Sequence, residues 1–93
     1  MYVRVVRFTD VDPDRVEQMV AEIDDSPREG VPAKALQILL DRDQRTSVVL
    51  QMFDSAEDMQ TAEAALDAMD PSETPGTRVS VDRCVLVREL SRA

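Results

Sequence analysis

The stretch Lys34–Asp54, KALQILLDRDQRTSVVLQMFD, decides how this chain folds. Two apolar runs, Ala35–Leu40 and Val48–Phe53, flank a polar turn at Asp41–Thr46, which predicts a β-hairpin. A helical pattern follows at once from Ser55. Both faces of this hairpin carry large apolar side chains, although one layer of helices covers only one face of a sheet. What covers the second face is therefore the functional question.

The segment before the hairpin predicts a strand and a helix. Tyr2–Thr9 is rich in Val and aromatic side chains, which favours a strand. Asp12 is a suitable N-cap, and Pro13 suits the first helical position because its missing N–H is not needed there. Apolar residues then recur at helical spacing to about Asp24. The prolines and glycine of Ser26–Pro32 predict a loop.

The hairpin and the segment after it complete the order βαββαβ. We expect the hairpin strands at 33–41 and 45–54, a second helix from Ser55 to Pro71, and a long last strand at 78–90. Ser55 and Asp58 have the spacing of a capping box, and Asp82–Arg83 suggests a bulge in the last strand. This order predicts a single α+β domain over residues 1–93: a ferredoxin-like sandwich of a four-stranded antiparallel sheet with two helices on one face.

Composition restricts the chemistry. The formal net charge is −8 and the Lys and Arg residues do not cluster, which disfavours binding to nucleic acid or to an anionic membrane. The chain has no His, Trp or Asn. Ser–His–Asp and Cys–His catalysis are therefore excluded, a zinc site is disfavoured, and we expect neither metal nor cofactor. With only Gly30 and Gly76, a dinucleotide fingerprint and a P-loop are also excluded.

The cysteine count and the N-terminus bear on location. Cys84 is the one cysteine, so it forms no internal disulfide, and an unpaired thiol fits a reducing cytoplasm. No His is available to activate the Cys84 thiol, so we expect Cys84 to be a small, buried, apolar side chain of the core. Met1 leads directly into strand-like sequence without a signal peptide, and no apolar run approaches the roughly 20 residues of a membrane span. These features predict a cytoplasmic protein.

Alternation divides each predicted strand into two sets of side chains. We assign the purely apolar sets to the helix-covered core, namely Val3, Val5, Leu36, Ile38, Leu40, Val48, Leu50 and Met52. The second face then holds the remaining sets, Tyr2, Arg4, Val6, Phe8, Gln37, Leu39, Val49, Gln51 and Phe53. Such a face is too apolar to remain in water. We therefore expect a second copy to cover it, sheet against sheet, in a homodimer.

Three segments carry a resemblance to a known family: YVRVVRF, VVLQMFDSAEDMQTAEAAL and VSVDRCVLVREL. With them nearly the whole chain resembles the dimeric α+β barrel superfamily, in particular the antibiotic biosynthesis monooxygenase family. The resemblance implies a homodimer whose sheets form a barrel, with a pocket between each sheet and its helices or loops. Active relatives use Asn, Trp and His there, which this chain lacks, and Phe53 stands where relatives often have Trp. The resemblance therefore implies the fold and the dimer, and no catalytic residue.

Five residues are candidates for ligand binding, and none is assigned to catalysis: Tyr2, Arg4, Gln37, Gln51 and Phe53. Arg4 lies within a predicted central strand, where it could hold an anion or a carboxylate. The alternative for Arg4 is an ion pair, with Asp82 or Glu89 as partner. The two glutamines could bind a polar ligand group or each other, the tyrosine offers a phenol, and the phenylalanine suits a cavity wall.

Two functions stand as alternatives. The first is a noncatalytic or small-ligand-binding homodimeric barrel protein, whose ligand would be small and hydrophobic or anionic. The second is a cofactor-independent monooxygenase-like enzyme acting on a small aromatic or polyketide-type substrate in the barrel cavity. Regulatory ligand-binding domains of amino-acid metabolism share the βαββαβ order but usually have a glycine after the first strand, which Thr9–Pro13 lacks. The missing acid–base and metal-binding residues favour the first.

Overall fold

The predicted order of strands and helices is confirmed. The computed structural model of the protein describes residues 1–22, 32–67 and 75–91. Its elements are β1 (Tyr2–Thr9), α1 (Pro13–Glu22), β2 (Ala35–Asp41), β3 (Thr46–Phe53), α2 (Ala56–Asp67) and β4 (Thr77–Val85). The predicted ends of the two helices, at Asp24 and Pro71, and nearly all of the loop 26–32 lie outside the described residues.

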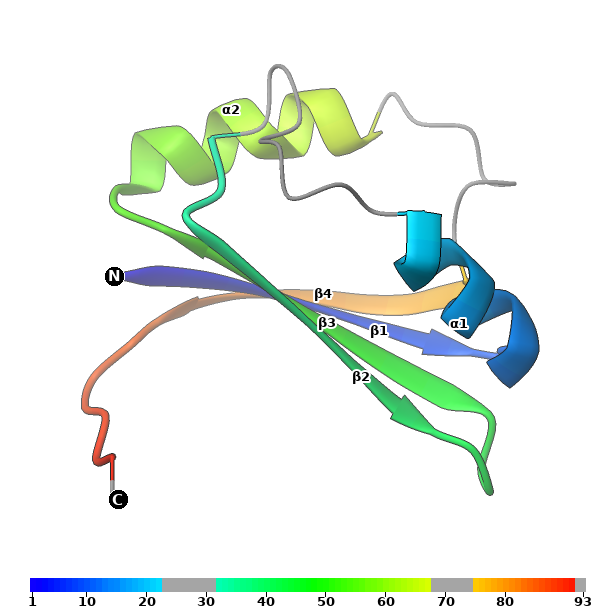
Figure 1. Ribbon diagram of the computed structural model, residues 1–93. Coiled ribbons are helices and arrows are strands. Elements are labelled where there is room, and N and C mark those ends of the chain that lie inside the picture. Colours follow the sequence, from blue (N-terminus) through cyan, green and yellow to red (C-terminus); the bar gives the residue numbers. More distant parts are fainter. Residues whose placement is uncertain (23–31, 68–74, 92–93) are drawn as a thin grey trace.

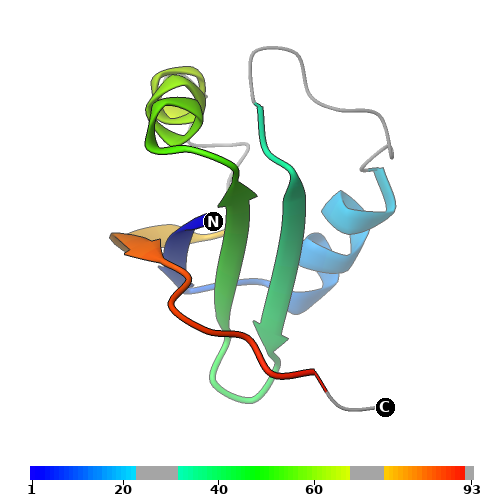
Figure 2. The ribbon, with the colours of Figure 1, turned by 90° about the vertical axis from the view of Figure 1, so that its left-hand side faces the viewer.

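The four strands form one antiparallel sheet in the order β2-β3-β1-β4. Both helices lie on the same side of this sheet, with α2 above one end of the strands and α1 near the other (Figure 1). Turned by 90°, the molecule shows α2 above β3 and α1 beside β2 (Figure 2). The arrangement agrees with the predicted ferredoxin-like α+β fold.

Each helix begins with the cap that the sequence predicts. The Asp12 carboxylate accepts a hydrogen bond from the Asp14 N–H at 3.1 Å, just before Pro13 opens α1. At α2, the Ser55 hydroxyl oxygen accepts from the Asp58 N–H, also at 3.1 Å. These contacts satisfy N–H groups that have no partner within the first helical turn.

The last strand differs from the prediction in length and in the position of its bulge. β4 ends at Val85, and the next residue adds one hydrogen bond, from the Leu86 N–H to the Met1 carbonyl at 2.8 Å. The predicted strand to residue 90 is wrong because β1 begins at Tyr2 and offers no further pairing partner. The irregularity lies near Val79, where Arg7 and Phe8 pair with Ser80 and Arg78, and not at the predicted Asp82–Arg83.

The predicted faces of β1 and β3 are wrong, whereas those of β2 are right. Leu40 pairs with Ser47 and Ile38 with Val49, so the helix side of β2 continues into the Ser47, Val49, Gln51 and Phe53 set of β3. Through Val49 and Val6, the same side continues into the Tyr2, Arg4, Val6 and Phe8 set of β1. The residues predicted to meet a second copy in these two strands therefore lie under the helices.

The core consists of two apolar clusters, one beneath each helix. Val6, Phe8 and Val11 pack with Val16 of α1, against partly buried Ile38, Leu40, Val49 and Val81. Phe53 packs with Met59 and Ala62 of α2, against partly buried Tyr2, Ala33 and Leu66. Between the two clusters the helix side of the sheet is polar, since Arg4 and Gln51 stand there as neighbours across β1 and β3.

Candidate functional site

Arg4 and Gln51 form the centre of a buried polar cluster under α2. The Arg4 Nη1 donates a hydrogen bond to the Gln51 Oε1 at 3.0 Å, and only 4% of Arg4 is exposed. The Arg4 Nε lies 3.4 Å from the Glu63 Oε1 of α2. The same Glu63 oxygen lies 2.6 Å from the Nε of Arg83, a half-exposed side chain of β4. Two guanidinium groups thus share one carboxylate between the sheet and the helix.

This cluster explains how a charged side chain is accommodated in a central strand. A buried guanidinium is costly unless a carboxylate and hydrogen-bond acceptors compensate it. Glu63 supplies the charge and Gln51 supplies an acceptor. The structure thus pairs Arg4 with Glu63. The predicted partner Asp82 forms an ion pair with Arg7, at 3.8 Å.

Sequence reasoning missed Glu63 and Arg83. A signal for Glu63 is present, since it comes four residues after Met59 and one after Ala62, both buried members of the α2 stripe. Residues four apart share a helix face. This spacing predicts that Glu63 lies on the side of α2 that faces the sheet. A buried carboxylate on that side needs a cation as its partner. Arg83 could be found only from the pairing of β1 with β4, which sets it directly opposite Arg4.

The structure separates the five predicted ligand-binding residues into two groups. Tyr2, Arg4, Gln51 and Phe53 all lie on the helix-covered side, where Phe53 is fully buried and Tyr2 packs against the α2 cluster. Gln37 is exposed and pairs with Leu50, so it lies on the opposite side of the sheet and does not meet Gln51. The binding role of these residues stays a prediction.

The side of the sheet away from the helices carries three rows of residues across the strands. The rows, each running from β2 to β4, are Ala35, Met52, Val3 and Cys84; Gln37, Leu50, Val5 and Asp82; and Leu39, Val48, Arg7 and Ser80. We call this surface the open face. Its centre is apolar and its polar groups lie toward the edges. Cys84 is an exposed free thiol on this face, so the prediction that it is buried is wrong.

Neither a metal site nor a membrane span is found among the described residues. No group of three or more His, Cys, Asp or Glu side chains gathers there in a way that could hold a metal ion. Neither described helix is long and apolar enough to cross a membrane. A groove of about 930 Å³ lies elsewhere, between α1 and β2.

Comparisons with protein-family models, curated proteins and solved structures give no match to this chain. The relation to the antibiotic biosynthesis monooxygenase family, together with the oxygenase alternative that it implies, therefore stays a prediction. The function has to be argued from the geometry of the chain itself.

Proposed function

We propose that this chain is a noncatalytic homodimeric module, in which the open face of one copy packs against the open face of a second to form a dimeric α+β barrel. The observation that carries the proposal is the apolar centre of the open face. Val3, Val5, Val48, Leu50 and Met52 are all partly exposed on it, and no helix of the described chain covers them. Large contiguous apolar surfaces of this kind usually mark an interface.

The segment after β4 also favours the open face as the dimer contact. Residues 86–91 leave the end of β4 and extend to the side away from α2 (Figure 1). Val87 is 93% exposed and Leu90 69% exposed in this segment. Two sheets that pack face to face bury alternating side chains of both inner faces. A second copy would thus cover the open face and give these two side chains an apolar surface to contact.

The noncatalytic part of the proposal rests on the buried polar cluster. Between the sheet and α2, Arg4 donates a hydrogen bond to Gln51 and forms an ion pair with Glu63, which is the arrangement of a structural network. To bind an anionic ligand, Arg4 would need to direct its guanidinium group into a space that the ligand can enter. A cytoplasmic location goes with the proposal, because Cys84 is a free thiol.

Sedimentation analysis of a Leu50→Glu variant tests the dimer. Leu50 lies in the middle row of the open face, so a carboxylate there would be buried without a partner on association. We expect the unaltered chain to sediment as a dimer at micromolar concentration and the variant as a folded monomer. Ala64→Glu adds the same charge at an exposed position of α2 and should leave the dimer intact. A monomeric unaltered chain, or a dimeric Leu50→Glu chain, would contradict the proposal.

The thiol of Cys84 offers a second readout in the unaltered chain. It lies on the open face in the row of Val3 and Met52. Its alkylation rate should fall as the protein concentration is raised through the dimer dissociation constant. In the Leu50→Glu variant the rate should be fast and independent of concentration.

A further inference from the structure

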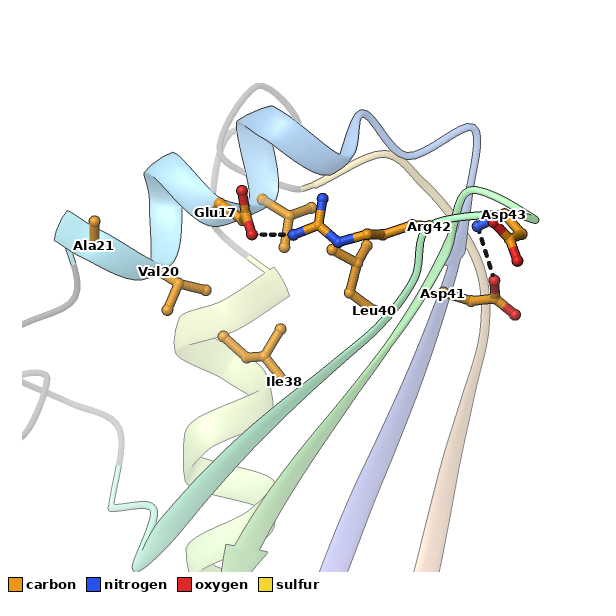
Figure 3. Close-up of a pocket in the computed structure, with 9 residues that line it drawn as sticks. Glu17, Val20, Ala21, Ile38, Leu40, Asp41, Arg42 and Asp43 are labelled. Atoms are coloured by element: carbon orange, nitrogen blue, oxygen red, sulfur yellow. Dashed lines mark hydrogen bonds and ion pairs between the residues drawn. The ribbon is translucent and has the colours of Figure 1, made fainter.

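The groove between α1 and β2 lies outside the open face and outside the Arg4 cluster. Its volume is about 930 Å³, within the range of ligand-binding sites. Its walls are apolar and come from both elements: Val16, Val20 and Ala21 from the helix, and Ile38 and Leu40 from the strand. The side chains of Val20 and Ile38 point toward each other across it (Figure 3). Val20 is 45% exposed, so the apolar wall is open to solvent.

The strand that forms one wall is an edge strand. β2 is at the end of the sheet, and among the described strands only β3 pairs with it. The Leu39 carbonyl oxygen faces β3, since it accepts a hydrogen bond from the Ser47 hydroxyl at 2.8 Å. In an antiparallel pair the backbone groups of successive residues point alternately toward the partner and away from it. The N–H and C=O groups of Ile38 and Leu40 therefore point outward.

The same two residues thus offer two kinds of recognition. Their side chains line the groove, and their outward backbone groups can pair with another strand. An extended peptide uses both features when it adds to a sheet edge, because main-chain hydrogen bonds give affinity and pockets receive alternate side chains. A compact small molecule would use the apolar walls and leave the strand edge unpaired.

The end of the groove is acidic. Glu17 and the one cation, Arg42, form an ion pair there, and Asp41 and Asp43 lie in the adjoining turn with their side chains directed away from α1 (Figure 3). The Asp41 carboxylate accepts hydrogen bonds from the N–H groups of Asp43 and Gln44, both at 3.1 Å, so the turn holds it in place. The excess negative charge here has the sign of the whole chain, whose formal net charge is −8. A basic partner would complement both the local negative charge and the net negative charge of the chain.

We propose that the groove binds an extended peptide segment of another protein. The segment pairs as an added strand with the outer edge of β2, places alternate apolar side chains between Val20 and Ile38, and carries Lys or Arg residues beside Asp41 and Asp43. The proposal does not depend on the homodimer, because the apolar walls of the groove lie on the helix side of β2, whereas the dimer contact uses the apolar centre of the open face.

The test uses a labelled, acetylated octapeptide of alternating valine and lysine, with binding followed by fluorescence anisotropy. We expect saturable binding to the folded protein below about 1 mM. Val20→Arg should weaken it by roughly tenfold or more, because the longer side chain fills the groove from a partly exposed position. Gln60→Arg, at an exposed position of α2, adds the same charge elsewhere and should leave binding unchanged.

Three companion measurements make the proposal falsifiable. A valine–glutamate peptide should not bind, and equal binding would overturn the role of the acidic end. A peptide N-methylated on its pairing edge should lose binding; equal binding would point to a small apolar ligand and overturn strand addition. If the protein forms species larger than a dimer that Val20→Arg abolishes, the occupant is a second copy and the proposal is wrong. Leu50→Glu should retain peptide binding, which separates this proposal from the homodimer.

Discussion

The carboxylate of Glu63 carries more of the stability of the buried polar cluster than either guanidinium that it contacts. Glu63 lies near both Arg4 and Arg83. Arg4 has a side chain that is 5% exposed, whereas that of Arg83 is 58% exposed and can be solvated by water. Loss of the carboxylate therefore leaves a buried cation, while loss of Arg4 leaves a carboxylate that still has Arg83.

This asymmetry predicts an order of stabilities. Glu63→Leu should destabilise the fold by about 3–5 kcal/mol, the typical cost of a buried charge that has lost its partner. Arg4→Met should cost less, and the double variant should cost less than the sum of the two single changes. Denaturant unfolding at one fixed protein concentration measures all three, because dimerisation would add a concentration-dependent term. A larger effect for Arg4→Met than for Glu63→Leu would contradict the assignment.

At the scale of the elements, the corner where β1 turns into α1 is held against the start of β4. Asp10 has a positive φ of 54°, and Arg45 in the β2–β3 turn has a φ of 56°. The Arg45 carbonyl accepts a hydrogen bond from the Val11 N–H at 3.0 Å, and Val11 is 1% exposed. Gly76 completes the corner, since a Cβ there would lie 2.5 Å from the Thr9 carbonyl oxygen.

Gly76→Ala should therefore destabilise the protein. The nearest atom to the new methyl group belongs to the backbone of β1, so relief requires β4 or the corner to shift. We expect a loss of about 1–3 kcal/mol, the usual range for overpacking in a tight site. Thr77→Ala, at the exposed next position, is the matched control and should change stability far less. Equal unfolding midpoints for Gly76→Ala and the unaltered chain would show that the corner is looser than its geometry indicates.

The order of strands and helices could be predicted from the sequence. Which side chains of β1 and β3 face the helices could not. Alternation sorts residues into sets and does not say which set faces the helices. We chose the purely apolar sets. That choice is wrong because Arg4 is accommodated under α2 by the ion pair with Glu63 and by the hydrogen bond to Gln51. Turn length was the better guide. With Asp41 opposite Thr46, Leu40 must face the same side as Ser47 and Val49, not Val48.

The correction changes the surface that is left uncovered. The predicted second face contained Arg4 and Gln51 in its centre, whereas the open face has Val5 and Leu50 there. Polar groups remain near its edges, as in the ion pair of Arg7 with Asp82. The centre of an interface on the open face would therefore be more apolar than the sequence predicts.

At the scale of the whole molecule, this apolar contact must form between two acidic chains. Each copy has a formal net charge of −8, so a dimer joins two bodies that repel one another. Salt screens such repulsion, with a Debye length that falls from about 30 Å at 0.01 M to about 10 Å at 0.1 M. Burial of apolar side chains does not depend on this screening.

The dimer should consequently tighten as salt is added. We expect the dissociation constant, measured by sedimentation equilibrium, to fall between about 0.01 M and 0.1 M NaCl, the range over which the Debye length changes most. Ala64→Glu, which adds one negative charge on α2 away from the interface, should dimerise with a steeper dependence on salt. Leu50→Glu should remain monomeric throughout. A dissociation constant that rises with salt would mean that ion pairs hold the two copies together, and the apolar centre of the open face would then not be the contact.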